Sequence, residues 1–321
     1  MNDVLEQIGK IGIVPVVKID DAHNAVPLAK ALSAGGIPCA EITFRTQAGE
    51  DAIRAIAKEC PGVLVGAGTV LTPAQVDKAI DAGAKFIVAP GLNPKIVEYC
   101  IKKNIPVTPG CANPSDIETA LELGLEAVKF FPAEQAGGLP YIKAISAPYG
   151  KLKFMPTGGI SAANIASYTA FDKILACGGS WMVTSDLINS GEYDRITSLC
   201  REAVFSMLGF SLVHIGVNSP NEAEAEKCAK LFSSFFGFAL DARAKSIFSS
   251  NAIEVMKMQG RGTHGHIAIG TWSVPKALAY LERCGVAFDE SSITRTSSGD
   301  INFIYLKDEM LGFAVHLVTR K

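Results

Sequence analysis

Eight short apolar runs alternate with amphipathic helical stretches between the N-terminus and about Val183, and this alternation limits the possible folds most strongly. The runs are IGIVPVV (11–17), CAEITF (39–44), GVLVGAG (62–68), AKFIVA (84–89), IPVTPG (105–110), EAVKFF (126–131), KLKFMP (151–156) and DKILACG (172–178). Apolar strands between helices are typical of a parallel sheet that helices cover on both faces. Eight such units predict a (β/α)8 TIM barrel, in the α/β class. Counting alone leaves an open doubly wound sheet as the alternative.

A different pattern begins after a helical closing stretch that runs from about residue 187 to 208. Two similar rounds follow, each with a histidine-bearing strand, a helix and a closing strand. The first round has LVHIGV, a helix over about 221–237 and AIEVMKM; the second has GHIAIG, a helix over about 274–285 and FAVHLV. The sequence therefore predicts two domains. Residues 1–208 form the barrel, and residues 209–321 form a smaller α+β domain of two βαβββ units.

The bulk composition excludes several classes of protein. Hydrophobic residues make up 48% of the 321 residues and charged residues 19%, which is unlike a disordered chain. A net charge of −2 argues against nucleic acid or an anionic membrane as a partner. The N-terminal stretch lacks the apolar core of a signal peptide, and the eight scattered cysteines form no CxxC pair. We expect reduced thiols and a cytoplasmic protein.

Lys129 is the residue that points to an enzyme in the first domain. It lies in an apolar strand between Val128 and Phe130, where desolvation favours the neutral, nucleophilic amine. The alternative is a lysine that extends its amine to solvent at a barrel rim. Glu41 also stands among apolar neighbours, and a carboxylate near an imine can carry protons to and from the substrate. Its alternative role is an ion pair with Arg45.

Further candidate residues, most of them polar or glycine, lie at the predicted strand ends, where barrels place their active sites. The candidates for substrate binding are Arg45, Thr69, Pro90, Phe131, Thr157, Gly158, Gly159, Gly178, Gly179 and Ser180. Arg45 can bind a carboxylate with two parallel hydrogen bonds, and Thr69 can add a hydroxyl. The glycines of PTGG and CGGS let backbone N–H groups point at a phosphate, although a tight turn also explains each Gly-Gly pair.

These motifs carry a resemblance to a known family. GIPCAEITFRT, GAGTVLTP, APGLNP, KFFPAE, PTGGIS and GGSW, in this order over about residues 1–205, resemble the 2-dehydro-3-deoxy-phosphogluconate (KDPG) aldolase / 4-hydroxy-2-oxoglutarate (KHG) aldolase family. The resemblance implies a class I aldolase on a TIM barrel, usually a trimer, that needs no metal. It implies cleavage of phosphorylated KDPG to pyruvate and glyceraldehyde 3-phosphate, and of 4-hydroxy-2-oxoglutarate to pyruvate and glyoxylate.

The resemblance also assigns roles to the candidate residues. Lys129 would form the imine, and Glu41 would be the acid and base. Arg45 and Thr69 would hold the pyruvyl carboxylate, and the two glycine loops would hold the phosphate. The competing interpretation is a barrel that binds phosphate without an imine. The C4 stereochemistry of the substrate stays open, so a galactonate-derived epimer is the alternative substrate.

Four of the five histidines fall in the second domain, whereas His23 is expected at the surface of the first. LVHIGV, AIEVMKM, GHIAIG and FAVHLV resemble the strands of the vicinal-oxygen-chelate superfamily, which includes glyoxalase I and bleomycin-resistance proteins. The metal ligands that this resemblance implies are His214, Glu254, His266 and His316. Such ligands suit divalent zinc, nickel, iron or manganese.

His316 stands where a glutamate is common in that superfamily, and His264 lies nearer a turn, so His264 is left out of the set. Three alternatives for the second domain remain open. It is a metal-dependent isomerase, lyase or dioxygenase in its own right, a ligand sensor without a metal, or a module for assembly.

Overall fold

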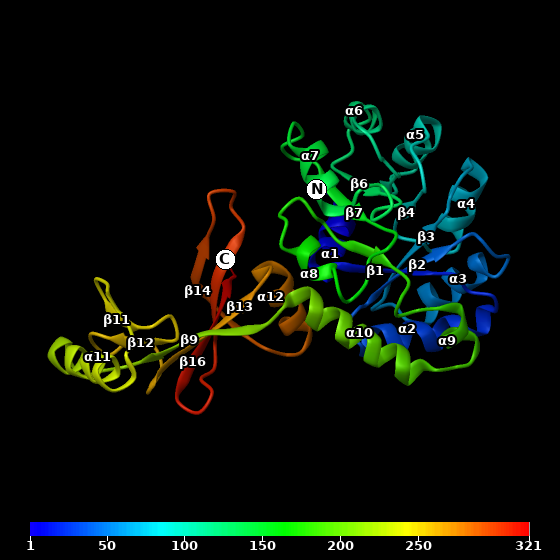
Figure 1. The fold of residues 1–321 in the computed structure, drawn as a ribbon. Coiled ribbons are helices and arrows are strands. Elements are labelled where there is room, and N and C mark those ends of the chain that lie inside the picture. Colours follow the sequence, from blue (N-terminus) through cyan, green and yellow to red (C-terminus); the bar gives the residue numbers. More distant parts are fainter. Residues whose placement is uncertain (321) are drawn as a thin grey trace. The chain divides into compact units, whose positions relative to one another are not determined.

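The computed structural model describes residues 1–320 (Figure 1). The contacts within the chain divide it into two compact units, one from Met1 to Met207 and one from Leu208 onward. The sequence placed this boundary one residue later. No helix among the described residues has both the length and the apolar character needed to cross a bilayer.

The first unit is a curled parallel sheet with helices around it (Figure 1). Its strands are β1 (Ile13–Val17), β2 (Cys39–Thr43), β3 (Leu64–Gly68), β4 (Ile87–Val88), β5 (Val107–Thr108), β6 (Ala127–Phe130), β7 (Lys153–Pro156) and β8 (Cys177–Gly179). Each predicted apolar run contains one of them, except that β8 ends one residue after the eighth run. Six strands pair in the order β5-β4-β3-β2-β1-β8, and β6 pairs with β7. Every pairing is parallel.

Helices separate the strands of the first unit along the chain. They are α1 (Asp3–Ile11), the 3-10 helix η1 (Ala22–Asn24), α2 (Ala25–Ala34), α3 (Gly49–Glu59), α4 (Pro73–Asp81), α5 (Pro94–Lys102), α6 (Pro114–Glu122), α7 (Gly138–Ser146), α8 (Ile165–Thr169), α9 (Ser185–Asn189) and α10 (Tyr193–Leu208). Three of them begin with a capping side chain followed by proline. Thr72, Asn93 and Asn113 each accept a hydrogen bond from a first-turn N–H group. The first residue of a helix has no intrahelical partner for its N–H group, and proline has no N–H group at all. Each pair of a capping residue and a proline therefore fixes where its helix begins.

The second unit is one eight-stranded sheet with two helices. Its strands are β9 (Ser211–Val217), β10 (Leu240–Ala242), β11 (Ser246–Ser249), β12 (Ile253–Met256), β13 (Gly265–Thr271), β14 (Phe288–Arg295), β15 (Ile301–Leu306) and β16 (Phe313–Thr319). The helices are α11 (Glu222–Phe236) and α12 (Val274–Arg283). The strand order is β10-β11-β12-β9-β13-β16-β15-β14. The first half of this order therefore comes from the first sequence round and the second half from the second round.

The register in the middle of this sheet brings matching positions of the two rounds together. Across the antiparallel β9–β13 pair, His214 stands opposite Ala268, and His266 stands opposite Gly216. In the flanking parallel pairs, Glu254 lies beside Gly216 and His316 lies beside Ala268. The four predicted metal-binding side chains therefore belong to the central four strands. Ala225 and Ala229 of α11 pack against Ile247 of β11 and Val255 of β12, and together they form a small buried core.

Candidate functional site

A cavity of about 330 Å³ opens at the carboxyl ends of the strands of the first unit. Its lining residues are Val16, Glu41, Thr43, Arg45, Thr69, Pro90, Lys129, Phe131, Thr157, Gly158, Gly159, Ile160, Gly179 and Ser180. Every sequence-predicted residue of the first domain except Gly178 is among them. Val16, Thr43 and Ile160 are lining residues that the sequence analysis did not name.

Lys129 and Glu41 form a buried pair in this cavity. Lys129 is 6% exposed and Glu41 1%, and the Lys129 amine lies 3.4 Å from Glu41 Oε1. The lysine therefore does not extend to solvent at a rim. The second carboxylate oxygen, Oε2, is buried without a hydrogen-bond partner. Because a buried polar atom without a partner is costly, this oxygen is available to a substrate group that enters the cavity.

The room for the Glu41 carboxylate comes from the neighbouring strand. Glu41 on β2 pairs with Gly66, and Gly68 follows two residues later on the same face. A Cβ atom at Gly68 would lie 2.2 Å from Glu41 Oε1, far inside van der Waals contact. The glycine at residue 68 is therefore what allows the carboxylate to point at Lys129.

Arg45 takes its orientation from Thr43. The Thr43 hydroxyl donates to the Val17 carbonyl at 2.8 Å and accepts from Arg45 Nε at 3.2 Å. Among residues 1–320 Arg45 makes no ion pair, so the alternative of an Arg45–Glu41 pair is wrong. Thr69, on the same wall, has a φ of 58°, which is unusual and strained for a β-branched residue.

Two glycine loops form the opposite wall. Gly158 and Gly159 have φ values of 101° and 77°, which only glycine adopts without strain. Within the described chain, the N–H groups of Gly159 and Ser180 make no hydrogen bond. These two donors are therefore free to pair with an anion.

Gly178, which the sequence also predicts to bind substrate, is not among the residues that line the cavity. It forms a parallel bridge with Thr157. A Cβ atom at Gly178 would lie 2.2 Å from Thr157 Oγ1, so this glycine makes room for the threonine.

The first unit is similar in sequence to a family of known enzymes. Residues 4–199, more than half of the chain, match the family described as KDPG and KHG aldolase. The chain belongs to this family. The resemblance found in the sequence motifs is thus confirmed for the first unit, and it identifies a carbon–carbon lyase.

Individual aldolases of the family are similar over almost their whole length. The 2-dehydro-3-deoxy-phosphogluconate aldolase of Haemophilus influenzae is 51% identical over 203 residues, which are 63% of this chain and 96% of that protein. The corresponding protein of Treponema pallidum is 46% identical over 204 residues, 64% of this chain and 97% of that protein. A solved KDPG aldolase from Legionella pneumophila is 38% identical, with a TM-score of 0.60, and covers 62% of this chain and 97% of its own. That structure holds pyruvate as a covalent carbinolamine.

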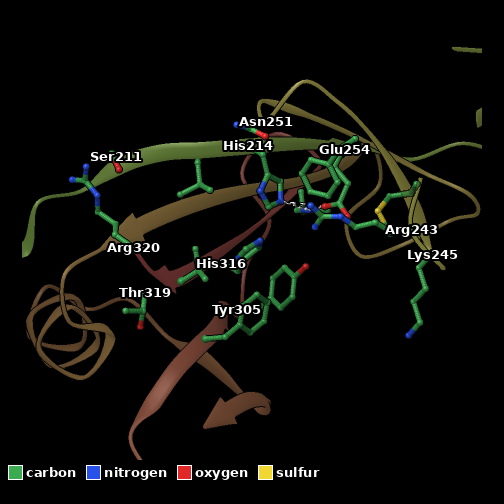
Figure 2. Close-up of a pocket in the computed structure, with 16 residues that line it drawn as sticks. Ser211, His214, Arg243, Lys245, Asn251, Glu254, Tyr305, His316, Thr319 and Arg320 are labelled. Carbon is green, nitrogen blue, oxygen red and sulfur yellow. Dashed lines mark hydrogen bonds and ion pairs between the residues drawn. The ribbon is translucent and has the colours of Figure 1, made fainter. Parts of the chain in front are cut away.

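The aldolase family match ends before the second unit, which has a pocket of its own of about 770 Å³ (Figure 2). Three polar atoms converge in it. His214 Nε2 and His266 Nε2 are 3.0 Å apart, and Glu254 Oε2 is 3.2 Å from the first and 3.0 Å from the second. His316 completes the group: one ring nitrogen of each histidine lies within 4.8 Å of the others. The four predicted residues therefore meet in one place.

The surroundings of this cluster keep Glu254 charged and His316 neutral. Burial works to raise the pKa of Glu254, but hydrogen bonds from His214, His266 and Ser246 bring it well below its usual range. Burial, followed by the neighbouring His266 and His214, lowers the pKa of His316 to about 3. His316 Nδ1 is buried without a partner. One carboxylate and three imidazole rings thus face one point.

The remaining histidines lie elsewhere, as expected. The His264 ring packs against the Phe313 ring, with centroids 5.8 Å apart. The exposed His23 side chain contacts Asp21 at 2.8 Å.

Proposed function

We propose that the first unit is a class I aldolase that cleaves KDPG to pyruvate and glyceraldehyde 3-phosphate. The observation that carries this proposal is the buried Lys129–Glu41 pair, placed between an arginine on one wall and free backbone N–H groups on the other. An amine next to a carboxylate suits imine chemistry. The two walls fit a substrate with a carboxylate at one end and a phosphate at the other.

The reaction follows from this placement. The Lys129 amine attacks the C2 ketone, and Glu41 relays protons while the carbinolamine loses water to give the imine. As the C4 hydroxyl loses its proton, the C3–C4 bond breaks and its electron pair moves to the imine nitrogen. Glyceraldehyde 3-phosphate leaves, and the resulting enamine is protonated at C3. Hydrolysis of the new imine releases pyruvate and restores the amine, so no metal takes part.

We propose KDPG as the better substrate and KHG as the poorer one. The glycine-loop wall would have no charge to bind in 4-hydroxy-2-oxoglutarate, which lacks a phosphate. Pro90 and Phe131 line the space between the two walls. The aromatic ring of Phe131 lies 5.5 Å from the Lys129 amine.

We propose that the eight strands of this unit form one closed (β/α)8 barrel. Single parallel bridges support the closure: Gly110 bridges to Lys129 between β5 and β6, and Thr157 bridges to Gly178 between β7 and β8. We propose a homo-oligomer, a trimer as the family resemblance implies, and light scattering should then give about three times the 33.9 kDa mass of the chain.

Reduction with borohydride in the presence of pyruvate tests the imine proposal. We expect a reduced pyruvyl adduct on the peptide that contains Lys129, found by peptide mass mapping. The exposed Lys102 is the internal control and should stay unmodified. A folded protein that gives no adduct at Lys129 would mean that this cavity does not perform imine chemistry.

We propose that the second unit is a vicinal-oxygen-chelate-like domain of two βαβββ units that holds one divalent cation. Bonds of about 2.1 Å from a metal to nitrogen and oxygen place neighbouring ligand atoms about 3.0 Å apart in an octahedron and about 3.4 Å apart in a tetrahedron. The three distances of 3.0–3.2 Å among His214, His266 and Glu254 fit this range. His316 Nδ1, which is buried without a hydrogen-bond partner, offers a fourth donor. A bound cation would supply Lewis-acid chemistry to a ligand in the pocket.

Metal analysis tests this second proposal on protein that carries no histidine tag. After loading with zinc, nickel or manganese and removal of excess metal, we expect about one ion per chain. His266→Ala should lose it, whereas His264→Ala, two residues away and outside the cluster, should keep it. A substoichiometric content in the parent chain would refute the proposal.

A further inference from the structure

The charge of the second pocket indicates what kind of molecule it accepts. Arg243, Lys245 and Arg320 line it, and Glu254 is the one carboxylate among its lining residues. That carboxylate is already engaged by Ser246, His214 and His266. The pocket therefore presents an excess of positive charge to anything that enters. Its volume is of the size that small-molecule sites have.

Arg243 is held in place on one side of the cluster. Its guanidinium carbon lies 4.0 Å from the centre of the Phe248 ring. Its Nε and Nη2 atoms lie 2.9 and 2.8 Å from Asp241 Oδ2. A guanidinium has five N–H donors, so stacking and this ion pair orient Arg243 while its other donors remain available.

Arg320 is held in a similar way on the other side. Its guanidinium carbon lies 4.1 Å from the centre of the Trp272 ring, and Nη1 donates to the Gly209 carbonyl at 2.9 Å. Figure 2 shows Arg320 near Ser211 and Thr319, across the histidine cluster from Arg243. The pocket thus has an oriented guanidinium at each end and the polar cluster between them.

Aromatic residues line the space between the two arginines. The Tyr305 ring packs against the His316 ring at 5.0 Å, and the Phe303 ring does so at 4.4 Å. These rings give a ligand an apolar surface to lie against, whereas the Arg243 side chain at one end of the pocket is exposed.

We propose that this pocket binds a small organic dianion with an acid group at each end. Arg243 takes one acid group and Arg320 takes the other, because a guanidinium matches the planar oxygens of a carboxylate or a phosphate. The middle of the ligand lies on the cluster of His214, Glu254, His266 and His316. This last contact rests on the cation proposed above, whereas the pairing of the two arginines with the acid groups does not need it. A phosphorylated sugar acid has the required form.

Tryptophan fluorescence can locate binding in this pocket. The chain has two tryptophans, Trp181 and Trp272. In a Trp181→Phe background, Trp272 reports from its place against Arg320. The probe is 6-phosphogluconate, which has both acid groups but no 2-oxo group for Lys129 to attack. We expect a saturable change in fluorescence with the metal-loaded full chain.

Matched variants decide whether the two arginines carry the binding. Arg243→Met and Arg320→Met should each weaken the binding by about tenfold or more, as the loss of a charge-assisted pair predicts. Arg295→Met, at an exposed arginine outside the pocket, should leave it unchanged. Glucitol 6-phosphate, with one acid group, should bind more weakly than the probe. Equal binding of both compounds, or binding that is insensitive to both pocket variants, overturns the proposal.

The metal content of the same samples separates this inference from the proposed metal function. A chain that holds one ion but shows no fluorescence change overturns the dianion site alone. A chain that holds no ion but binds 6-phosphogluconate through both arginines supports the dianion site and refutes the metal. Lys129→Met serves as a further control, because binding in the second pocket should survive that change.

Discussion

The two cavities of this protein collect buried polar groups in opposite ways. In the first unit, Lys129 and Glu41 are a donor and an acceptor, and each partly satisfies the other. In the second unit, His214, Glu254, His266 and His316 are side chains that can each present an electron pair to one point once the protons shared among them are released. A donor–acceptor pair can act on a substrate directly, whereas converging electron-pair donors are stable only when a cation or protons lie between them. The kind of polar group in each site is therefore the reason that we propose a metal for the second site and none for the first.

The largest effect is expected from the residue that defines the first site. Lys129→Met should lower the rate of KDPG cleavage by about 1,000-fold or more, because no other amine in the cavity can form the imine. Circular dichroism and metal content should stay unchanged. The control is Lys102→Met, which should retain the parent rate. A Lys129→Met variant that still cleaves KDPG would show that the first site does not act through an imine at Lys129.

The next effect tests the space around the carboxylate. In Gly68→Ala the new methyl group would overlap Glu41 Oε1, so the carboxylate must leave its position beside Lys129. We expect kcat to fall by about 100-fold, the order of loss for a displaced acid–base group. Gly62→Ala is the matched control, because a Cβ atom there meets no atom within 4 Å. Steady-state kinetics and thermal melts separate the catalytic effect from lost stability.

A glycine-to-alanine change in the second unit, Gly216→Ala, should affect the histidine cluster and not the aldolase site. A Cβ atom at Gly216 would lie 2.1 Å from the His266 ring. Gly216→Ala should therefore lower the affinity for a divalent ion by about 10- to 100-fold, as for other disturbances of ligand orientation. Competition with a fluorescent chelator measures this affinity. KDPG cleavage is the internal control, and a parallel loss of cleavage would contradict the independence of the two sites.

A smaller effect is expected at Thr43, which orients Arg45. Thr43→Val keeps the shape of the side chain but removes the hydroxyl that accepts from Arg45 Nε. We expect KM for KDPG to rise by about fivefold, with kcat nearly unchanged, because the hydrogen bond that orients Arg45, of about 1 kcal/mol, is lost. The loss of the second hydrogen bond, to the Val17 carbonyl, should appear in the thermal stability. Thr119→Val on α6, at a half-buried threonine outside the cavity, is the matched control. A fall in kcat instead of a rise in KM would mean that Thr43 acts on the chemistry.

The smallest effect on cleavage should come from metal removal. Dialysis against EDTA should leave the KDPG cleavage rate of the parent chain unchanged, because the imine reaction uses no metal. The same treatment should lower the melting temperature of the second unit, since a bound ion stabilises the folded state. Calorimetry follows the melting, and re-addition of zinc should reverse the shift. Loss of KDPG cleavage on chelation would mean that the first site also depends on a metal.

The first site could be predicted from the sequence because strand ends in a parallel sheet meet at one edge. That rule placed Lys129, Glu41 and the loop glycines together without any knowledge of their distances. It missed Thr43, although this residue lies two positions after Glu41 and therefore on the same face of its strand. It also assigned Gly178 to the cavity, because sequence spacing does not reveal which glycine of a pair faces inward.

The second site was harder to predict, because its geometry depends on sheet register. The repeated histidine strands indicated four residues that could meet. The sequence did not show that His266 would stand opposite a glycine, which gives its ring the space it occupies. Arg243 follows β10 and Arg320 follows β16, so only the folded sheet shows that both reach one pocket. Neither arginine belongs to a recognisable motif.

The register of the second sheet places the strands of the two βαβββ rounds in equivalent positions, so the residues of one round can be compared with those of the other. Glu254 and His316 occupy equivalent places, yet one is an anion and the other is neutral. A divalent ion bound by three neutral histidines and one carboxylate would keep one unit of positive charge. A symmetric pair of carboxylates would have cancelled it. If the proposed ion binds, this difference between the two halves adds positive charge to that of Arg243, Lys245 and Arg320.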